Sequence, residues 1–142
     1  MKYIGIIAAM NEEVNAIKKI MTDISVKTIY ELEFITGKIN EKEVVLVKCG
    51  VGKVNAARTT QILLNNFEIE YVINVGTAGS LNKNIEIGDV VIGEKLVQHD
   101  FDITAAGREK GYITDVGKYF YSDKSLVEKT KKEIELGKDR QW

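Results

Sequence analysis

The 142-residue chain has no proline, one cysteine, one histidine and one tryptophan. A lone cysteine excludes an internal disulfide framework and fits a reducing compartment, so we expect a cytoplasmic protein. Without proline, the loops must turn on glycine and asparagine, and no proline-rich linker divides the chain. The first apolar run is short, is broken by Gly5 and is followed by acidic residues, which predicts neither a secretory signal nor a membrane-spanning helix.

The chain also lacks an excess of charge of either sign. Its 20 Lys+Arg and 21 Asp+Glu give a formal net charge of −1. A nucleic-acid partner bound through phosphate charge is therefore not expected. The 44% hydrophobic and 29% charged content is typical of a globular chain. The length suits one domain, or part of one, with its own core.

Apolar runs and helical spacings predict alternating strands and helices. Continuous apolar runs are typical of strands buried on both faces, and apolar stripes at a spacing of three or four residues are typical of amphipathic helices. The predicted strands are Tyr3–Ala8, Lys27–Tyr30, Leu32–Ile39, Glu43–Val47, Tyr71–Val75 and Ile87–Ile92, the last extended by Lys95–Val97. The first predicted helix is capped by Asn11 and has the apolar stripe Val14, Ile17, Ile20 and Met21. The second has the stripe Val54, Ala57, Gln61 and Leu64 and ends at Asn65–Asn66. The third runs from Ser122 or Asp123 to Leu136, with Gly137 as its end signal. A hairpin turn is expected at Asn40–Glu41, and a mostly irregular loop over Gln98–Ile113.

This alternation predicts an α/β fold in which a mixed, mostly parallel central sheet with one antiparallel hairpin is flanked by helices. In such sheets, ligands bind outside the carboxyl ends of the strands. Three loops follow predicted strand ends, namely Ala9–Glu13, Cys49–Lys53 and Gly76–Ser80. Because all three are rich in small or polar residues, the sequence points to a binding site at this edge.

The glycine-rich loop Gly50–Lys53 is not a known phosphate-binding motif. A Walker A loop requires Ser or Thr after the lysine, where Val54 stands, and the dinucleotide motif requires a glycine where Asn55 stands. On the pattern alone, a tight strand-to-helix turn is favoured over a loop that offers N–H groups to a ligand. Glu12 and Glu13 likewise fit either acids in a first helical turn or a catalytic carboxylate.

Other chemically suggestive residues have more ordinary interpretations. His99 with Asp100 and Asp102 lacks the ligand number and spacing of a zinc site, and we expect no metal and no cofactor. The apolar strand before Cys49 favours a small buried residue over a reactive thiol. The aromatic cluster of Tyr112 and Tyr119–Tyr121 favours a core or a subunit contact over a base-stacking surface.

Taken together, the loops resemble a known family. The matching segments, in family order, are Ile4–Val14, Cys49–Ala57, Asn74–Gly79, Gly88–Val91 and His99–Thr104. They resemble the 5′-methylthioadenosine/S-adenosylhomocysteine nucleosidases, which belong to the nucleoside phosphorylase/hydrolase superfamily. The resemblance runs from residue 1 to about Gly107. It implies a nucleoside phosphorylase-like fold and metal-free hydrolysis of the bond between adenine and a 5′-thioribose.

The resemblance also implies roles for particular residues. Glu13 aligns with the base that activates water, and Thr77 with a residue near that water and the ribose. The other positions matched to the substrate pocket are Ala9, Met10, Val51, Ala78, Gly79, Ile103 and Ala106. Family members are commonly homodimers, because the positions of Ile103 and Ala106 complete the partner's alkylthio pocket. Ala106 departs from the Phe often found there, which leaves the 5′-substituent open.

Further departures bear on the type of reaction. Related phosphorylases carry an arginine where Asn74 stands, and the chain has few arginines, which favours hydrolysis. The family's ribose-gripping and purine-protonating motifs do not occur after Gly107. We therefore expect residues 1–142 to form a single α/β domain, the N-terminal part of a longer nucleosidase domain, with little activity alone. The alternatives are a phosphorylase relative, a non-catalytic nucleoside-binding or assembly fragment, and a related substrate of the futalosine type.

Overall fold

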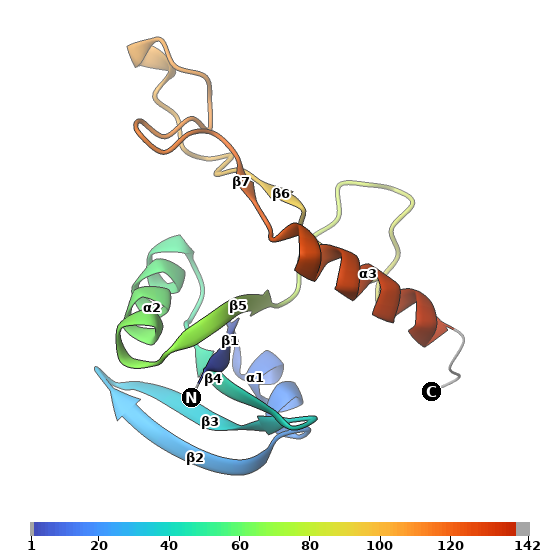
Figure 1. Ribbon diagram of the computed structural model, residues 1–142. Helices are drawn as coiled ribbons and strands as arrows, with labels where there is room; N and C mark the ends of the chain where they lie inside the picture. Colours follow the sequence, from blue (N-terminus) through green and yellow to red (C-terminus); the bar gives the residue numbers. More distant parts are fainter. Residues whose placement is uncertain (1, 139–142) are drawn as a thin grey trace. The chain divides into compact units, whose positions relative to one another are not determined.

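A computed structural model describes residues 2–138 of the chain (Figure 1). The described residues fall into two compact units, which divide between Ser80 and Leu81. The first unit carries the loops singled out above, and the second contains the segment that follows them.

The first unit is built on a mixed β-sheet. Its strands are β1 (Tyr3–Ala8), β2 (Thr22–Ile29), β3 (Leu32–Ile39), β4 (Lys42–Lys48) and β5 (Ile69–Val75), and its helices are α1 (Asn11–Lys18) and α2 (Lys53–Asn66). Among the described residues, the strand order is β2-β3-β4-β1-β5. β1 runs parallel to both β4 and β5, whereas β3 pairs antiparallel with β2 and with β4. The predicted mixed α/β fold is confirmed, with parallel pairing confined to the β4-β1-β5 half.

The central strands β1, β3 and β4 are buried on both faces, one beneath each helix (Figure 1), whereas the edge strands β2 and β5 are largely exposed. Alternate residues of β1 point to opposite faces, so that Ile6 packs on the α1 side and Ile7 on the α2 side. The α1 side contains Ile6, Ala8, Val14, Met21, Ile35, Val44 and Leu46. The α2 side contains Ile7, Phe34, Val45, Val47 and Leu63. This double burial explains why β1 and β4 read as continuous apolar runs.

Two-residue turns join β2 to β3 and β3 to β4. Tyr30 and Glu31 in the first turn, and Asn40 and Glu41 in the second, all have positive φ. Such turns match the twist of the flanking strands. The hairpin turn predicted at Asn40–Glu41 is confirmed, and the chain makes one more hairpin than expected because it reverses in the same way at Tyr30–Glu31.

The two helices of the first unit differ from expectation in detail. α1 begins at Asn11 itself, so Met10 occupies the cap position, and the helix ends at Lys18 before the 64% exposed Ile20. The stripe predicted for α2 is wrong, since Val54 is 82% exposed while Leu63 is fully buried. α2 turns Leu63 toward the sheet, where the side chain packs over Gly5. The absence of a Cβ on Gly5 makes this contact possible, since a Cβ there would lie only 2.8 Å from Leu63 Cδ2.

The second unit contains less regular structure. Its elements are β6 (Lys95–Leu96), the short 3₁₀ helix η1 (Thr104–Ala106), β7 (Phe120–Tyr121) and α3 (Lys124–Lys138). β6 pairs antiparallel with β7. The strand predicted at Ile87–Ile92 is wrong: this segment has no strand partner among the described residues, and Val90 and Val91 are about two-thirds exposed. The loop predicted over Gln98–Ile113 is confirmed apart from η1 and a single bridge at Ile113.

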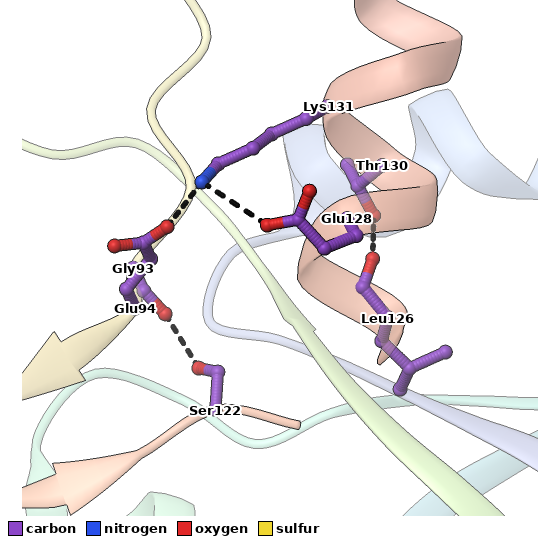
Figure 2. Close-up of polar contacts among 7 residues, drawn as sticks. All are labelled: Gly93, Glu94, Ser122, Leu126, Glu128, Thr130 and Lys131. Carbon is purple, nitrogen blue, oxygen red and sulfur yellow. Dashed lines mark hydrogen bonds and ion pairs between the residues drawn. The ribbon is translucent and has the colours of Figure 1, made fainter. Parts of the chain in front are cut away.

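Polar contacts connect α3 to the segment that enters β6 (Figure 2). The Lys131 ammonium contacts the carboxylates of Glu94 and Glu128, and the Ser122 hydroxyl donates to the Gly93 carbonyl. At the start of α3, Asp123 accepts a hydrogen bond from the Leu126 N–H at 2.9 Å, so this residue, one of the two predicted starts, is the cap just before the helix. The end predicted at Leu136 is wrong, since α3 continues through Gly137 to Lys138. In the part of the chain that the structure describes, no helix combines the length and apolar character needed to cross a membrane.

Candidate active site

The three loops picked out from the sequence follow β1, β4 and β5, which are neighbours in the sheet. Their parallel pairing places the three carboxyl ends at one edge. The Cys49 N–H donates to the Ala8 carbonyl at 2.8 Å, which joins the loop after β4 to the end of β1. The Thr77 N–H reaches a carboxylate in the loop-and-helix segment after β1. The three loops therefore lie together at one edge of the sheet, within the first unit.

Glu13 is the centre of this arrangement. Its Oε2 accepts hydrogen bonds from the N–H groups of Ala9, at 2.9 Å, and Met10, at 3.0 Å. Its Oε1 accepts one from the Thr77 N–H at 3.1 Å. The contact with Met10 is the reach of an N3 glutamate back to the cap residue of its own helix. The contact with Thr77 comes from a segment 64 residues away and fixes the carboxylate between β1 and β5.

These donors hold the pKa of Glu13 below its ordinary value of 4.5. The N–H of Met10 has the largest effect, partial desolvation opposes it, and the N–H groups of Thr77 and Ala9 add to it. The Thr77 side chain also hydrogen-bonds to the carboxylate and lowers the pKa further. Hydrogen bonds to the charged form favour that form, so Glu13 is ionised at neutral pH. A fixed carboxylate of this kind can orient water and stabilise a neighbouring positive charge.

The loop after β4 owes its shape to two glycines. Gly50 and Gly52 have φ of 81° and 103°, a region that favours glycine. The Asn55 side chain donates to the Val51 carbonyl at 2.8 Å and holds the loop against the start of α2. Val51 between the glycines is 73% exposed. The turn predicted from the pattern is confirmed, and it presents Val51 to solvent.

Cys49 behaves as a packing residue. It is half-buried against the α2-side core. Desolvation is the main cause that raises the pKa of its thiol, and the charge of Glu13 raises it further, against the opposing effect of a backbone hydrogen bond. The thiol is therefore neutral at physiological pH, as the apolar sequence context predicts.

The remaining predicted residues fall into two groups. Ala9 and Met10 lie in the loop after β1, and Thr77, Ala78 and Gly79 lie in the loop after β5, following Gly76. Together with Glu13 and Val51, these residues belong to the carboxyl edge of the sheet in the first unit. Ile103 and Ala106 lie in the second unit, where Ile103 precedes η1 and Ala106 is its last residue.

Two features of the edge were not predicted from the sequence. The Lys48 ammonium, at the end of β4, donates to the Asn11 side chain at 2.9 Å. Gly76 passes so close to Glu13 that a Cβ on it would lie 3.0 Å from Oε1. The contact of Lys48 follows from its place opposite Ala8 in the sheet register, which the sequence does not show. No sequence signal marked the contact of Gly76.

The His99–Asp102 segment forms local contacts. Asp102 Oδ1 accepts hydrogen bonds from the Thr104 N–H at 3.0 Å and from its hydroxyl at 2.8 Å. Within residues 2–138, no three His, Cys, Asp or Glu side chains are grouped as they would be to hold a metal ion.

Comparison with known proteins places the chain in a family. Residues 3–139 match the family model described as the Phosphorylase superfamily, and the chain belongs to that superfamily. Within it, the chain is 45% identical over 131 residues to a 5′-methylthioadenosine/S-adenosylhomocysteine nucleosidase of Marinomonas sp. (strain MWYL1). That alignment covers 92% of this chain and 57% of the relative.

The chain is also similar to solved structures of nucleoside hydrolases. The chain matches the Neisseria meningitidis 5′-methylthioadenosine/S-adenosylhomocysteine nucleosidase in complex with methylthio-immucillin-A, with a TM-score of 0.93, 33% identity, and coverage of 98% of this chain and 60% of that one. It also matches a futalosine hydrolase mutant of Helicobacter pylori, with a TM-score of 0.87, 30% identity, and coverage of 93% and 60%. The chain thus spans a little over half the length of the relatives it matches.

Proposed function

We propose that the chain contributes the water-activating side of a nucleosidase site that hydrolyses the adenine–ribose bond of 5′-methylthioadenosine or S-adenosylhomocysteine. The observation that carries the proposal is the Glu13 carboxylate, held by N–H donors from the segments that follow β1 and β5. The similarity to nucleosidases of that name supports the substrate class.

In the proposed reaction, the C1′–N bond of the nucleoside breaks and its electron pair leaves with adenine. The ribose develops oxocarbenium character, which the negative charge of Glu13 stabilises. A water molecule hydrogen-bonded to Glu13 forms the new C1′–O bond, and one of its protons passes to the carboxylate. Adenine takes up a proton from an acid or from solvent. The products are adenine and the 5′-thioribose.

The arginines favour water over phosphate as the nucleophile. Asn74, in β5, occupies the position where related phosphorylases carry an arginine. Arg58 instead donates to the Tyr30 carbonyl at 3.1 Å, and Arg108 lies 5.3 Å from the centre of the Tyr112 ring. Both arginines therefore make local contacts, and Asn74 lacks the guanidinium that holds phosphate through two parallel hydrogen bonds.

The proposal extends to the substrate pocket and the assembly. Its residues in the first unit are Ala9, Met10, Val51, Thr77, Ala78 and Gly79. Ile103 and Ala106 complete the alkylthio side of the pocket in a second copy, which makes the functional form a homodimer. The reaction requires no metal or cofactor, and the single cysteine fits the cytoplasm.

The test is adenine release from methylthioadenosine by the 142-residue chain and by Glu13→Gln. We expect the chain to turn over about 10²–10⁴-fold more slowly than a complete acid–base site, because its matched residues lie on the water side. We expect Glu13→Gln to lower the residual rate by at least about 10²-fold, since the amide cannot accept a proton. Glu12→Gln, at an exposed position of the same helical turn, is the matched control. Equal rates for Glu13→Gln and the parent would contradict the assigned base.

A second substrate deserves the same assay because the chain also matches a futalosine hydrolase structure. Faster purine release from futalosine than from methylthioadenosine would move the proposal to that nucleoside. Heat of binding with methylthioadenosine, without release of adenine, would instead favour a non-catalytic nucleoside-binding chain.

A further inference from the structure

Gly76 lies where β5 ends, between the strand and the Thr77 N–H that contacts Glu13. A Cβ built on Gly76 would lie 3.0 Å from Glu13 Oε1, 3.5 Å from Cδ and 3.6 Å from Oε2. All three nearest atoms therefore belong to one functional group, the carboxylate assigned above as the base.

The reason for glycine here is space rather than backbone angle. Gly76 is not among the residues with positive φ, so alanine could adopt its conformation without strain. A contact of 3.0 Å is closer than carbon and oxygen normally approach, so one of the two groups must move. The carboxylate has little freedom, because Ala9, Met10 and Thr77 hold it on both oxygens.

We propose that Gly76 is a positioning residue: its missing side chain lets the end of β5 approach Glu13 closely enough for the Thr77 N–H to fix Oε1 in its reactive orientation. The residue itself does not touch substrate. It acts through the carboxylate, and its relevance to adenine release rests on the function proposed above.

The first test measures the geometry without using activity. In the 142-residue chain, the Glu13 side-chain carbon and the Thr77 amide are followed by NMR as the pH is lowered. In Gly76→Ala, we expect the Thr77 amide to lose its response to the ionisation of Glu13, and the Glu13 midpoint to move toward its ordinary value. The Cys49 thiol also faces this carboxylate, but its raised pKa keeps it neutral throughout the titration.

Gly79→Ala is the control for this titration. Gly79 lies in the same loop and lacks positive φ, and a Cβ on it would meet nothing within 4 Å. We expect its titration curves to match those of the parent. Unchanged curves for Gly76→Ala as well would overturn the proposal.

The second test concerns the reaction. We expect Gly76→Ala to lower kcat for adenine release by at least about tenfold and to change KM little, because a displaced base affects the transition state more than binding. Gly93→Ala is the control, since Gly93 lies in the second unit and its added Cβ would make only ordinary contacts of 3.8–3.9 Å. An altered titration together with adenine release that Glu13→Gln leaves unchanged would refute the proposed function and leave the positioning role standing.

A double-mutant comparison separates the contact with Glu13 from a general disturbance of the loop. If Gly76→Ala destabilises the chain, it should destabilise a Glu13→Ala background less, because the colliding carboxylate is already gone there. Equal destabilisation in the parent and in the Glu13→Ala background would overturn the proposal.

Discussion

Thr77 links strand β5 to the carboxylate of Glu13 in two ways. Its N–H donates to Oε1 at 3.1 Å, and its side chain adds a further hydrogen bond that lowers the pKa of Glu13. The backbone donor depends on the path of the chain, whereas the side-chain donor depends on residue type. A substitution that removes only the hydroxyl can therefore separate the two.

We predict that Thr77→Val raises the pKa of Glu13 toward 4.5, because the charged carboxylate loses one donor while the Thr77 N–H remains. The acid limb of the rate profile should move to higher pH, since Glu13 must be ionised to act as a base. NMR titration of Glu13 measures the shift. Thr60→Val is the matched control, because that hydroxyl donates to the Ala56 carbonyl within α2. A downward shift in Thr77→Val would contradict the assigned hydrogen bond.

The same residue links pH to folding. Because the folded-state pKa of Glu13 is depressed, its ionisation contributes stability that is present above the unfolded-state pKa. That contribution is lost as the pH falls through the folded-state pKa. Thr77→Val narrows the difference between the folded-state and unfolded-state pKa of Glu13 and so removes part of this stability at neutral pH. The loss of stability caused by Thr77→Val should become smaller as the solution is acidified.

At the scale of elements, the sequence determines strands better than helix faces. β1 begins and ends at the predicted residues, because a strand buried on both faces has an uninterrupted apolar sequence. The face of α2 could not be inferred, because its orientation depends on the space above Gly5 for Leu63. The strand predicted at Ile87–Ile92 fails for a related reason, since an extended apolar segment becomes a strand only where a partner pairs with it.

In the turn between β2 and β3, Glu31 adopts a backbone conformation to which a residue with a Cβ is poorly suited. Tyr30 and Glu31 have φ of 47° and 65°, in the left-handed region that glycine and asparagine prefer. We predict that Glu31→Gly stabilises the chain by about 1 kcal/mol, because glycine removes the steric cost of that conformation. Denaturant unfolding measures the change. Glu31→Ala is the control, since it also removes the carboxylate but keeps a Cβ; an equal gain in both variants would refute the backbone explanation.

At the scale of the whole molecule, the strand ends of the predicted sheet pointed to the edge of the proposed site, and the resemblance of its loops to a family pointed to Glu13. Glu13 and Thr77 are 64 residues apart in sequence, yet the parallel pairing of β1 with β5 brings them into contact. Family motifs and sheet topology could therefore locate the carboxylate. The contribution of Gly76 could not be found in this way, because a glycine carries no chemical group and its role appears only in distances to its neighbours.

The two units differ in how much apolar surface they bury, and this leads to the last prediction. The buried apolar side chains described in residues 2–80 form two clusters, one on each face of the sheet. In the described part of the second unit, the one buried apolar side chain is that of Val127. Since local opening costs less where few apolar groups are buried, we predict slow amide exchange in β1 and β4. We predict fast exchange over Lys83–Val91.

Hydrogen exchange of the 142-residue chain, read by peptide mass spectrometry and corrected for intrinsic rates, measures this contrast. Protection in β1 should approach that of global unfolding, because its amides pair with strands on both sides. Protection over Lys83–Val91 should be small, because these residues form only isolated turns and Ile87, Val90 and Val91 are exposed. Equal protection in the two units would show that the second has a packed core of its own or shares that of the first, which would contradict the prediction.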